Sequence, residues 1–255
     1  MPFARSNGYK IFFEVSGSGS PVVLHPGMFE DGRHWAHLGY TEILAAFHTV
    51  IAIDPLGLGA SDGPREPAAY ALERRVQYVT AVLDELGLGR AAFWGYSLGA
   101  MTGYAMAAHA PERLTRLVAG AFDPNGFRSR VPDVLAALGL PGDFDVYEIV
   151  KQGALSSPYQ VAVIERGDPA AHRANYEMFS REPGLGGRLA ASGVPALMYA
   201  GTADPWHDPM RDYARSQGVE FFPVPDADHG GALRRPDEVL PRVLPFLSAD
   251  NQQDA

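Results

Sequence analysis

The 255-residue chain carries 21 Lys and Arg against 30 Asp and Glu, a formal net charge of −9 that disfavours nucleic acid and anionic lipid as partners. It has no cysteine, which excludes disulfides, thiolate metal sites and a cysteine nucleophile. Hydrophobic residues make up 46%, enough for the core of one large domain. Residues 1–10 are polar, unlike a signal peptide, and no segment approaches the ~20 apolar residues that cross a bilayer. We therefore expect a cytoplasmic protein that binds neither nucleic acid nor membranes.

Short apolar, β-prone segments alternate with longer helical patterns along most of the chain. The expected strands are residues 10–15, 21–25, 49–53, 91–96, 117–122, 196–200 and 220–224. The expected helices are residues 70–86, a segment from just after Ser97 to Pro111, residues 209–216 and residues 236–247. This alternation predicts an α/β fold whose mostly parallel central sheet has helices on both faces.

The alternation stops between residues 123 and 191. Helical patterns replace strands there, at residues 131–138, 146–154 and 170–179. We interpret this segment as a small helical cap inserted between two strands of the sheet. The predicted organisation is a core of residues 1–122 and 192–250, a cap of residues 123–191, and a frayed tail of residues 251–255.

The sequence Gly95-Tyr96-Ser97-Leu98-Gly99 follows an apolar strand and precedes a helix rich in small residues. The pattern alone fits an ordinary Gly-rich strand–helix turn, but this strand–turn–helix setting is what a nucleophile elbow requires. In so tight a turn the two glycines avoid clashes, and Ser97 is presented above the strand ends. Its hydroxyl is therefore the candidate nucleophile for attack on a carbonyl group.

An acyl-transfer site also needs backbone N–H groups directed at the oxyanion. Leu98, directly after the candidate nucleophile, is expected to supply one of them. The second is expected from the loop His25-Pro26-Gly27-Met28 that follows another apolar strand. Pro26 has no N–H, so Met28 is the first choice and Gly27 the second. His25 is expected to hold this loop by hydrogen bonding rather than to act as a base.

Two further candidates follow the last two predicted strands. Asp204 lies after the strand at 196–200, and His229 lies after the strand at 220–224. A carboxylate and an imidazole at the ends of successive strands can meet the serine above the sheet, with His229 as base and Asp204 orienting it. Asp123 also ends a predicted strand and is the alternative acid.

Taken together, these segments resemble the α/β-hydrolase superfamily, in which the triad follows the order Ser, Asp, His. The segments that carry the resemblance are Gly95–Gly99, His25–Met28, Asp54–Ser61, Gly201–Asp204 and His229-Gly230. The resemblance implies the α/β-hydrolase fold with a small helical cap, no cofactor, and a structural role for Asp54. The sequence departs from the usual pattern at Pro26, which interrupts the family's His-Gly pair, while the seven-residue step from Met28 to Trp35 resembles the family's spacing.

These parts predict a serine hydrolase that cleaves a carboxylic ester or lactone through an acyl-enzyme. The expected partner is a small hydrophobic acyl substrate. Aromatic residues near the predicted site are candidates for binding it, although core packing explains each of them equally well. The candidate substrate-binding residues are Phe29, Trp35, Tyr96, Phe127 and Trp206. The alternatives are a cofactor-free perhydrolase or haloperoxidase, a C–C bond hydrolase with the same triad, and a non-hydrolytic small-molecule receptor on this scaffold.

No metal site is expected. His34 and His37, with Glu30 and Asp31 nearby, do not have the spacing of a standard ligand motif, and polar residues of a helix or loop explain them.

Overall fold

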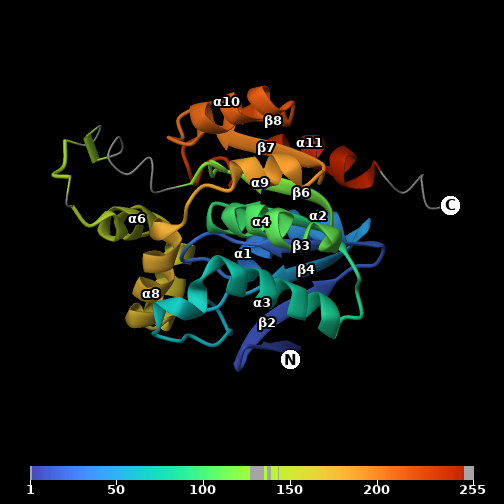
Figure 1. The fold of residues 1–255 in the computed structure, drawn as a ribbon, viewed down its shortest axis with the longest axis horizontal. Helices are drawn as coiled ribbons and strands as arrows, with labels where there is room; N and C mark the ends of the chain where they lie inside the picture. Colours follow the sequence, from blue (N-terminus) through green and yellow to red (C-terminus); the bar gives the residue numbers. More distant parts are fainter. Residues whose placement is uncertain (1, 127–134, 137–138, 143, 250–255) are drawn as a thin grey trace.

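The computed structural model describes residues 2–126, 135–136, 139–142 and 144–249. In this part of the chain, eight strands form one sheet in the order β1-β2-β4-β3-β5-β6-β7-β8 (Figure 1). The strands are β1 (Phe3–Ser6), β2 (Tyr9–Ser16), β3 (Ser20–His25), β4 (His48–Ile53), β5 (Ala91–Tyr96), β6 (Leu114–Gly120), β7 (Ala196–Gly201) and β8 (Glu220–Val224). β2 pairs antiparallel with β1 and β4, and the other pairs are parallel. The predicted α/β fold is confirmed, and β1 is an edge strand that the sequence did not predict.

The parallel pairing determines where the candidate residues lie. β3 is hydrogen-bonded to β5, with His25 opposite Gly95, and β5, β6, β7 and β8 follow one another across the sheet. The carboxyl ends of these strands therefore share one edge of the sheet, where open α/β sheets bind their ligands. The loops after β3, β5, β7 and β8 carry the predicted oxyanion donor, nucleophile, acid and base.

Helices cover both faces of the sheet and create two apolar layers. α3 (Leu72–Glu85), α4 (Leu98–His109) and α10 (His207–Gln217) contribute to one layer, and α2 (Tyr40–Ala45) and α11 (Pro236–Ser248) to the other. Within β5, Phe93 packs into the first layer and Trp94 into the second, and neither is exposed. Because both faces are covered, all six residues of β5 are buried. The candidate nucleophile thus follows a rigid central strand.

In the described part of the segment between β6 and β7, the chain forms four helices. They are α6 (Val146–Ala154), α7 (Pro158–Arg166), α8 (Pro169–Arg181) and α9 (Gly186–Ala191), and α6 and α8 lie together at one side of the sheet (Figure 1). The side chains of Asp145, Ser157 and Asp168 cap the first three by accepting backbone N–H groups. α6 and α8 correspond to predicted helices, whereas α7 and α9 were not predicted. The predicted helix at 131–138 lies largely outside the described residues.

The helix α8 is joined to the core through a buried cation. Arg75 of α3 donates to the side-chain oxygen of Asn175 at 2.6 Å, and Asn175 donates to the Leu56 carbonyl at 3.4 Å. Burial lowers the pKa of Arg75 to about 10, so the guanidinium keeps its charge at neutral pH. The remaining short helices are α1 (Arg33–His37), η1 (Pro67–Tyr70) and η2 (Pro111–Arg113).

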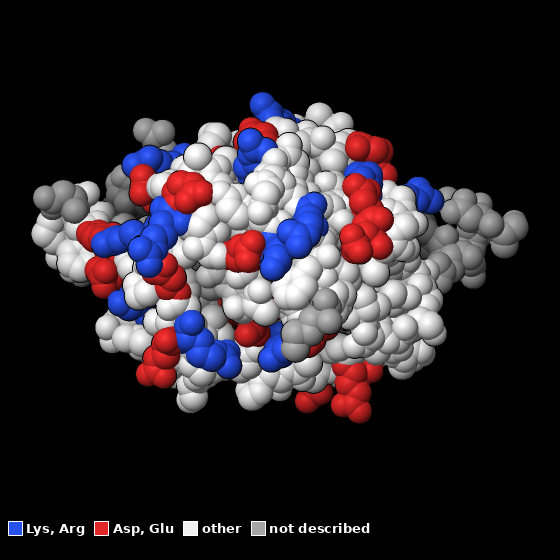
Figure 2. All heavy atoms as spheres, turned by 90° about the horizontal axis from the view of Figure 1, so that it is seen from below, with Lys and Arg blue, Asp and Glu red and all other residues white. Residues whose placement is uncertain are grey.

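Acidic and basic side chains are interspersed on the face of the molecule in Figure 2, without a continuous basic area there. Among the described helices, none combines the length and the apolar character that a membrane span requires.

Candidate active site

The turn between β5 and α4 holds Ser97 in a strained backbone conformation, with φ 53° and ψ −110°. A Cβ on Gly95 would lie 2.1 Å from the carbonyl oxygen of Gly99, and a Cβ on Gly99 would lie 2.1 Å from that of His25. Only glycine fits at either position, because a side chain would force the strand, the turn or β3 apart. The sequence pattern therefore encodes the sharp turn that presents Ser97 at the edge of the sheet.

Three side chains from separate loops form one hydrogen-bonded chain. The Nε2 atom of His229 lies 3.1 Å from Ser97 Oγ, and its Nδ1 atom lies 2.9 Å from Asp204 Oδ2. The side chain of Asp204 is fully buried, and its Oδ1 accepts the Trp206 N–H at 3.0 Å. The hydroxyl of Tyr96 donates to the backbone carbonyl of His229 and holds that loop. The structure thus brings together the three residues that the sequence proposed.

The surroundings of His229 favour its charged form. Burial lowers the pKa of its imidazole, but Asp204, Glu30 and Asp228 outweigh this effect and raise the pKa above its ordinary value of 6.5. The carboxylate at Nδ1 requires a proton on that nitrogen, which leaves Nε2 of the neutral ring free to accept the Ser97 hydroxyl proton. The side chain is 42% exposed, so the reacting edge of the ring is accessible.

The competing candidates occupy other environments. Asp123 is buried and accepts hydrogen bonds from the N–H and side-chain amide of Asn125, whereas Asp204 contacts the imidazole of His229. His25 is buried, and its Nδ1 lies 3.1 Å from the Pro26 carbonyl oxygen. Burial lowers the pKa of His25 to about 4, so it is neutral and donates to that carbonyl, as expected for a residue that holds the loop.

The loop after β3 distinguishes between the two candidate oxyanion donors. The N–H of Gly27 donates to Glu30 Oε2 at 2.9 Å, so it is already in use. Among the described residues, no acceptor takes the N–H of Met28 or of Leu98. Phe29, directly after Met28, has a φ of 61°, a left-handed conformation rare for a bulky residue. The arrangement leaves Met28 and Leu98 as the two available donors.

A cavity of about 430 Å³ opens beside Ser97 and His229. Three of the predicted substrate-binding residues, Phe29, Tyr96 and Trp206, line it. Trp35 does not: it is 1% exposed and packs against Trp94 within the second apolar layer. We therefore correct its assignment to a core residue. The predicted contact Phe127 lies outside the described residues.

The sequence did not single out most of the other cavity residues. Ile149 and Val150 of α6, Phe179 of α8 and Phe122 give it an apolar wall. The only available signal was the apolar spacing along α6 and α8, which core packing explains equally well.

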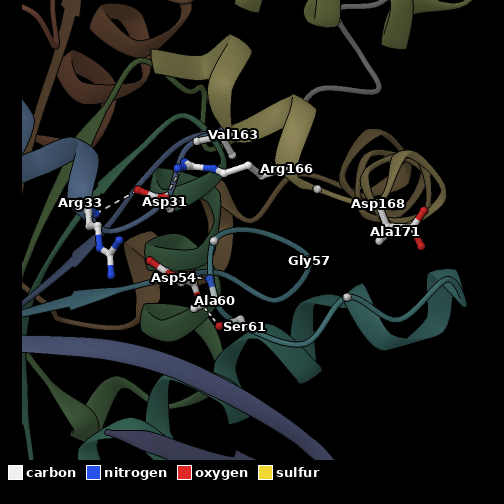
Figure 3. Close-up of a pocket in the computed structure, with 13 residues that line it drawn as sticks. Asp31, Arg33, Asp54, Gly57, Ala60, Ser61, Val163, Arg166, Asp168 and Ala171 are labelled. Carbon is white, nitrogen blue, oxygen red and sulfur yellow. Dashed lines mark hydrogen bonds and ion pairs between the residues drawn. The ribbon is translucent and has the colours of Figure 1, made fainter. Parts of the chain in front are cut away.

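A second cavity, of about 410 Å³, lies between the loop after β4 and the junction of α7 and α8 (Figure 3). Among its charged groups, Asp31 Oδ2 lies 3.7 Å from the Arg166 guanidinium. Asp54 accepts the N–H groups of Gly32 and Ala60 at 2.7 Å each and so joins the loops after β3 and β4. Burial raises the pKa of Asp54 to about 6, against the lowering effect of these two bonds. The described residues include no group of three or more His, Asp, Glu or Cys side chains that could hold a metal ion.

The chain matches the family model of the alpha/beta hydrolase fold over residues 20–147, and it belongs to this family. It is 32% identical over 152 residues to the "Putative carbamate hydrolase RutD" of Azorhizobium caulinodans, covering 58% of this chain and 55% of that protein. It is 34% identical over 130 residues to bifunctional epoxide hydrolase 2 of Sus scrofa, covering 48% of this chain and 23% of that protein. The matches thus span about half the length of the first relative and about a quarter of the second.

Solved structures share the fold over nearly the whole chain. The enol-lactonase from Burkholderia xenovorans LB400 has a TM-score of 0.77 and 24% identity, with 96% of this chain and 99% of that chain covered. A hydrolase from Pseudomonas aeruginosa PA01 has a TM-score of 0.73 and 25% identity, with 97% and 98% covered. The predicted α/β-hydrolase superfamily and fold are confirmed, and the hydrolases among these proteins agree with the prediction of an α/β-hydrolase enzyme.

Proposed function

We propose that this protein is a serine hydrolase that cleaves a carboxylic ester or lactone through an acyl-enzyme. The observation that carries the proposal is the continuous chain from Asp204 through His229 to Ser97, with contacts of 2.9 and 3.1 Å, beside a cavity. Ser97 is the nucleophile, His229 the base, and Asp204 the group that orients the imidazole and stabilises its positive charge.

The reaction proceeds in two halves. His229 Nε2 takes the Ser97 proton as Oγ attacks the substrate carbonyl, and the N–H groups of Met28 and Leu98 stabilise the tetrahedral oxyanion. The C–O bond to the alcohol breaks, and the alkoxide takes the proton from the imidazolium. Water, losing a proton to His229, then attacks the acyl-enzyme, and Ser97 recovers its proton as the acid is released. For a lactone, the alcohol and the acid are parts of one product.

The cavity supports a small or medium-sized apolar acyl compound. Its volume of about 430 Å³ is within the range of small-molecule sites, and Ile149, Val150 and Phe179 supply part of its apolar wall. The enol-lactonase among the structural neighbours, and an esterase from Thermogutta terrifontis with a TM-score of 0.78 and 21% identity, are consistent with ester or lactone substrates.

A fluorophosphonate probe followed by peptide mapping tests the proposed nucleophile directly. We expect a single adduct on Ser97, none in Ser97→Ala, and a kcat for this variant about 10⁴ to 10⁶ lower on the best substrate of an ester and lactone panel. An adduct on a different residue, or no turnover across esters and lactones of varied acyl length, would contradict the proposal.

A further inference from the structure

The carboxylate of Glu30 lies at the proposed active site, although the mechanism above does not use it. Its side chain is 9% exposed and lines the cavity beside Ser97. A Cβ on Gly27 would lie 3.1 Å from Glu30 Oε2 and 3.5 Å from Ser97 Cβ, so the carboxylate and the serine flank the same backbone position. Burial of a charged side chain at this position requires compensation from its neighbours.

Hydrogen-bond donors on the loop and on the cap surround this carboxylate. The Gly27 N–H donates to Oε2 at 2.9 Å, and Gln160 Nε2 of α7 donates to Oε1 at 3.2 Å. His34 Nδ1 lies 3.2 Å from Oε1 but is not hydrogen-bonded to it. The same Gln160 Nε2 donates to the Met28 carbonyl oxygen at 3.3 Å. Glu30 and Gln160 therefore hold the peptide groups on both sides of the Met28 N–H.

The backbone of the loop after β3 has a strained conformation that its neighbours must stabilise. Phe29 has a φ of 61°, and such conformations of non-glycine residues cost roughly 1–3 kcal/mol and persist only where the surroundings impose them. Phe29 is fully buried, with its ring edge-on to those of Tyr147 and His172. The Glu30 hydrogen bond closes the loop on the other side, from residue 30 back to residue 27.

The neighbouring acid, Asp31, faces the other way. It lines the second cavity, where its carboxylate accepts the Arg33 N–H at 3.1 Å and the Tyr159 hydroxyl and lies 3.7 Å from Arg166 (Figure 3). The two adjacent acidic residues thus line two different cavities, and within the described part of the chain Asp31, but not Glu30, forms an ion pair with a guanidinium.

The surroundings of His229 contain several charged and polar groups. Asp204 contacts its Nδ1, Glu30 lines the same cavity, and Tyr96 donates to its backbone carbonyl. Asp228, on its own loop, is 71% exposed and lies 3.5 Å from the Arg234 guanidinium, which also lines the cavity. The α6 residues in the lining are uncharged, and His34 faces Glu30. Apart from Asp204, Glu30 is the one buried acid among these lining residues.

We propose that Glu30 is a positioning residue of this site with two separable effects. As an acceptor, its carboxylate fixes the loop so that the Met28 N–H faces the reacting carbonyl. As a negative charge, it stabilises the imidazolium that His229 becomes when it takes the serine proton. The proposal rests on the serine hydrolase function proposed above.

Two substitutions separate these effects. Glu30→Gln keeps an oxygen for the Gly27 N–H but removes the charge. Glu30→Ala removes both the acceptor and the charge. The matched control is Asp84→Asn, which also removes one negative charge. Asp84 is bonded to Arg113, which donates to the Gly89 carbonyl just before β5, at the end of that strand opposite Ser97.

The measurement is the rate of fluorophosphonate labelling of Ser97 from pH 5 to 9, together with kcat/KM for an accepted ester. Loss of the charge lowers the pKa of His229. In Glu30→Gln we therefore expect the acidic limb of the rate–pH profile to move to lower pH by about 0.5–1 unit, while the maximal rate stays within about tenfold of wild type. In Glu30→Ala we expect the maximal rate to fall about 10²-fold, the effect of losing one oxyanion donor, with KM little changed. Asp84→Asn should match the wild type.

Thermal unfolding shows whether each variant is folded. If Glu30→Ala is not folded, the acidic limb of the Glu30→Gln profile still tests the proposal. An acidic limb at the wild-type pH in Glu30→Gln overturns the proposal, as does a folded Glu30→Ala that is labelled at the wild-type rate. Wild-type protein that is not labelled at Ser97 would instead overturn the proposed function, and this inference with it.

Discussion

Replacement of Asp204 by Asn tests the orientation of the imidazole most directly. The substitution keeps the size of the side chain but removes a fully buried charge that lies 2.9 Å from His229 Nδ1. Two charges at this separation interact by about 6 kcal/mol at an effective dielectric constant of about 20. Because the imidazole is 42% exposed, solvent screening reduces this to about 4 kcal/mol. At 1.36 kcal/mol per factor of ten, this loss should lower kcat by about 10³.

The amide adds a second defect, because its NH₂ group would donate to Nδ1 and leave the proton of the neutral ring on Nε2, where it cannot accept from Ser97. The assay is kcat on an accepted ester, with Asp123→Asn as the matched control. Asp123 accepts from Asn125, and an Asn at 123 retains an acceptor, so the control should lose less than about tenfold. If Asp123→Asn loses activity and Asp204→Asn does not, the acid is Asp123 and the assigned geometry is wrong.

Three further predictions concern the surroundings of the triad. Tyr96→Phe removes the hydrogen bond to the His229 carbonyl, worth about 1 kcal/mol, and should lower kcat by about five- to tenfold without a large change in Tm; an unchanged kcat would count against this role. Gly99→Ala places a Cβ 2.1 Å from the His25 carbonyl oxygen and should destabilise the fold by about 3 kcal/mol or prevent folding, as measured by urea unfolding. Since the pKa of His229 is raised, kcat/KM should fall as the pH decreases, with a midpoint above 6.5; a midpoint at or below 6.5 would refute the carboxylate effect.

The sequence predicted the elements whose conformation depends mainly on contacts within a short segment or on burial of both faces. The glycines at 95 and 99 are required by contacts within a single turn and with its neighbouring strand, so the pattern shows the turn without knowledge of the rest of the fold. The parallel strands are apolar because both faces are covered, and this pattern also appears in the sequence. β1 is a short edge strand with one fully buried residue, Ala4, and it therefore gave no comparable signal.

The errors and omissions concern contacts that form only when distant segments of the chain fold together. Trp35 lies seven residues after Met28, but α1 directs it to the apolar layer with Trp94 and Tyr40, away from the cavity. Nearness in sequence to the proposed site does not indicate whether a side chain lines the cavity or packs in the core. The choice between Gly27 and Met28 depended in the same way on a contact that the sequence does not reveal, the hydrogen bond from Gly27 to Glu30.

Backbone strain is concentrated where the proposed chemistry takes place. Of the five non-glycine residues with positive φ in the described part of the chain, Asn7 lies in the turn between the antiparallel strands β1 and β2, and the other four follow the carboxyl ends of parallel strands. Phe29 follows β3, Ser97 follows β5, Ala121 follows β6 and Asp226 follows β8. At roughly 1–3 kcal/mol each, these conformations must be imposed by the packing around them. For Phe29 that packing includes the helices between β6 and β7, since Tyr147 of α6 and His172 of α8 contact its ring and Gln160 of α7 holds the Met28 carbonyl. Because the proposed mechanism uses the Met28 N–H, these helices should act on the rate of reaction as well as on the choice of substrate, and substitutions on α7 should change kcat even for substrates too small to contact them.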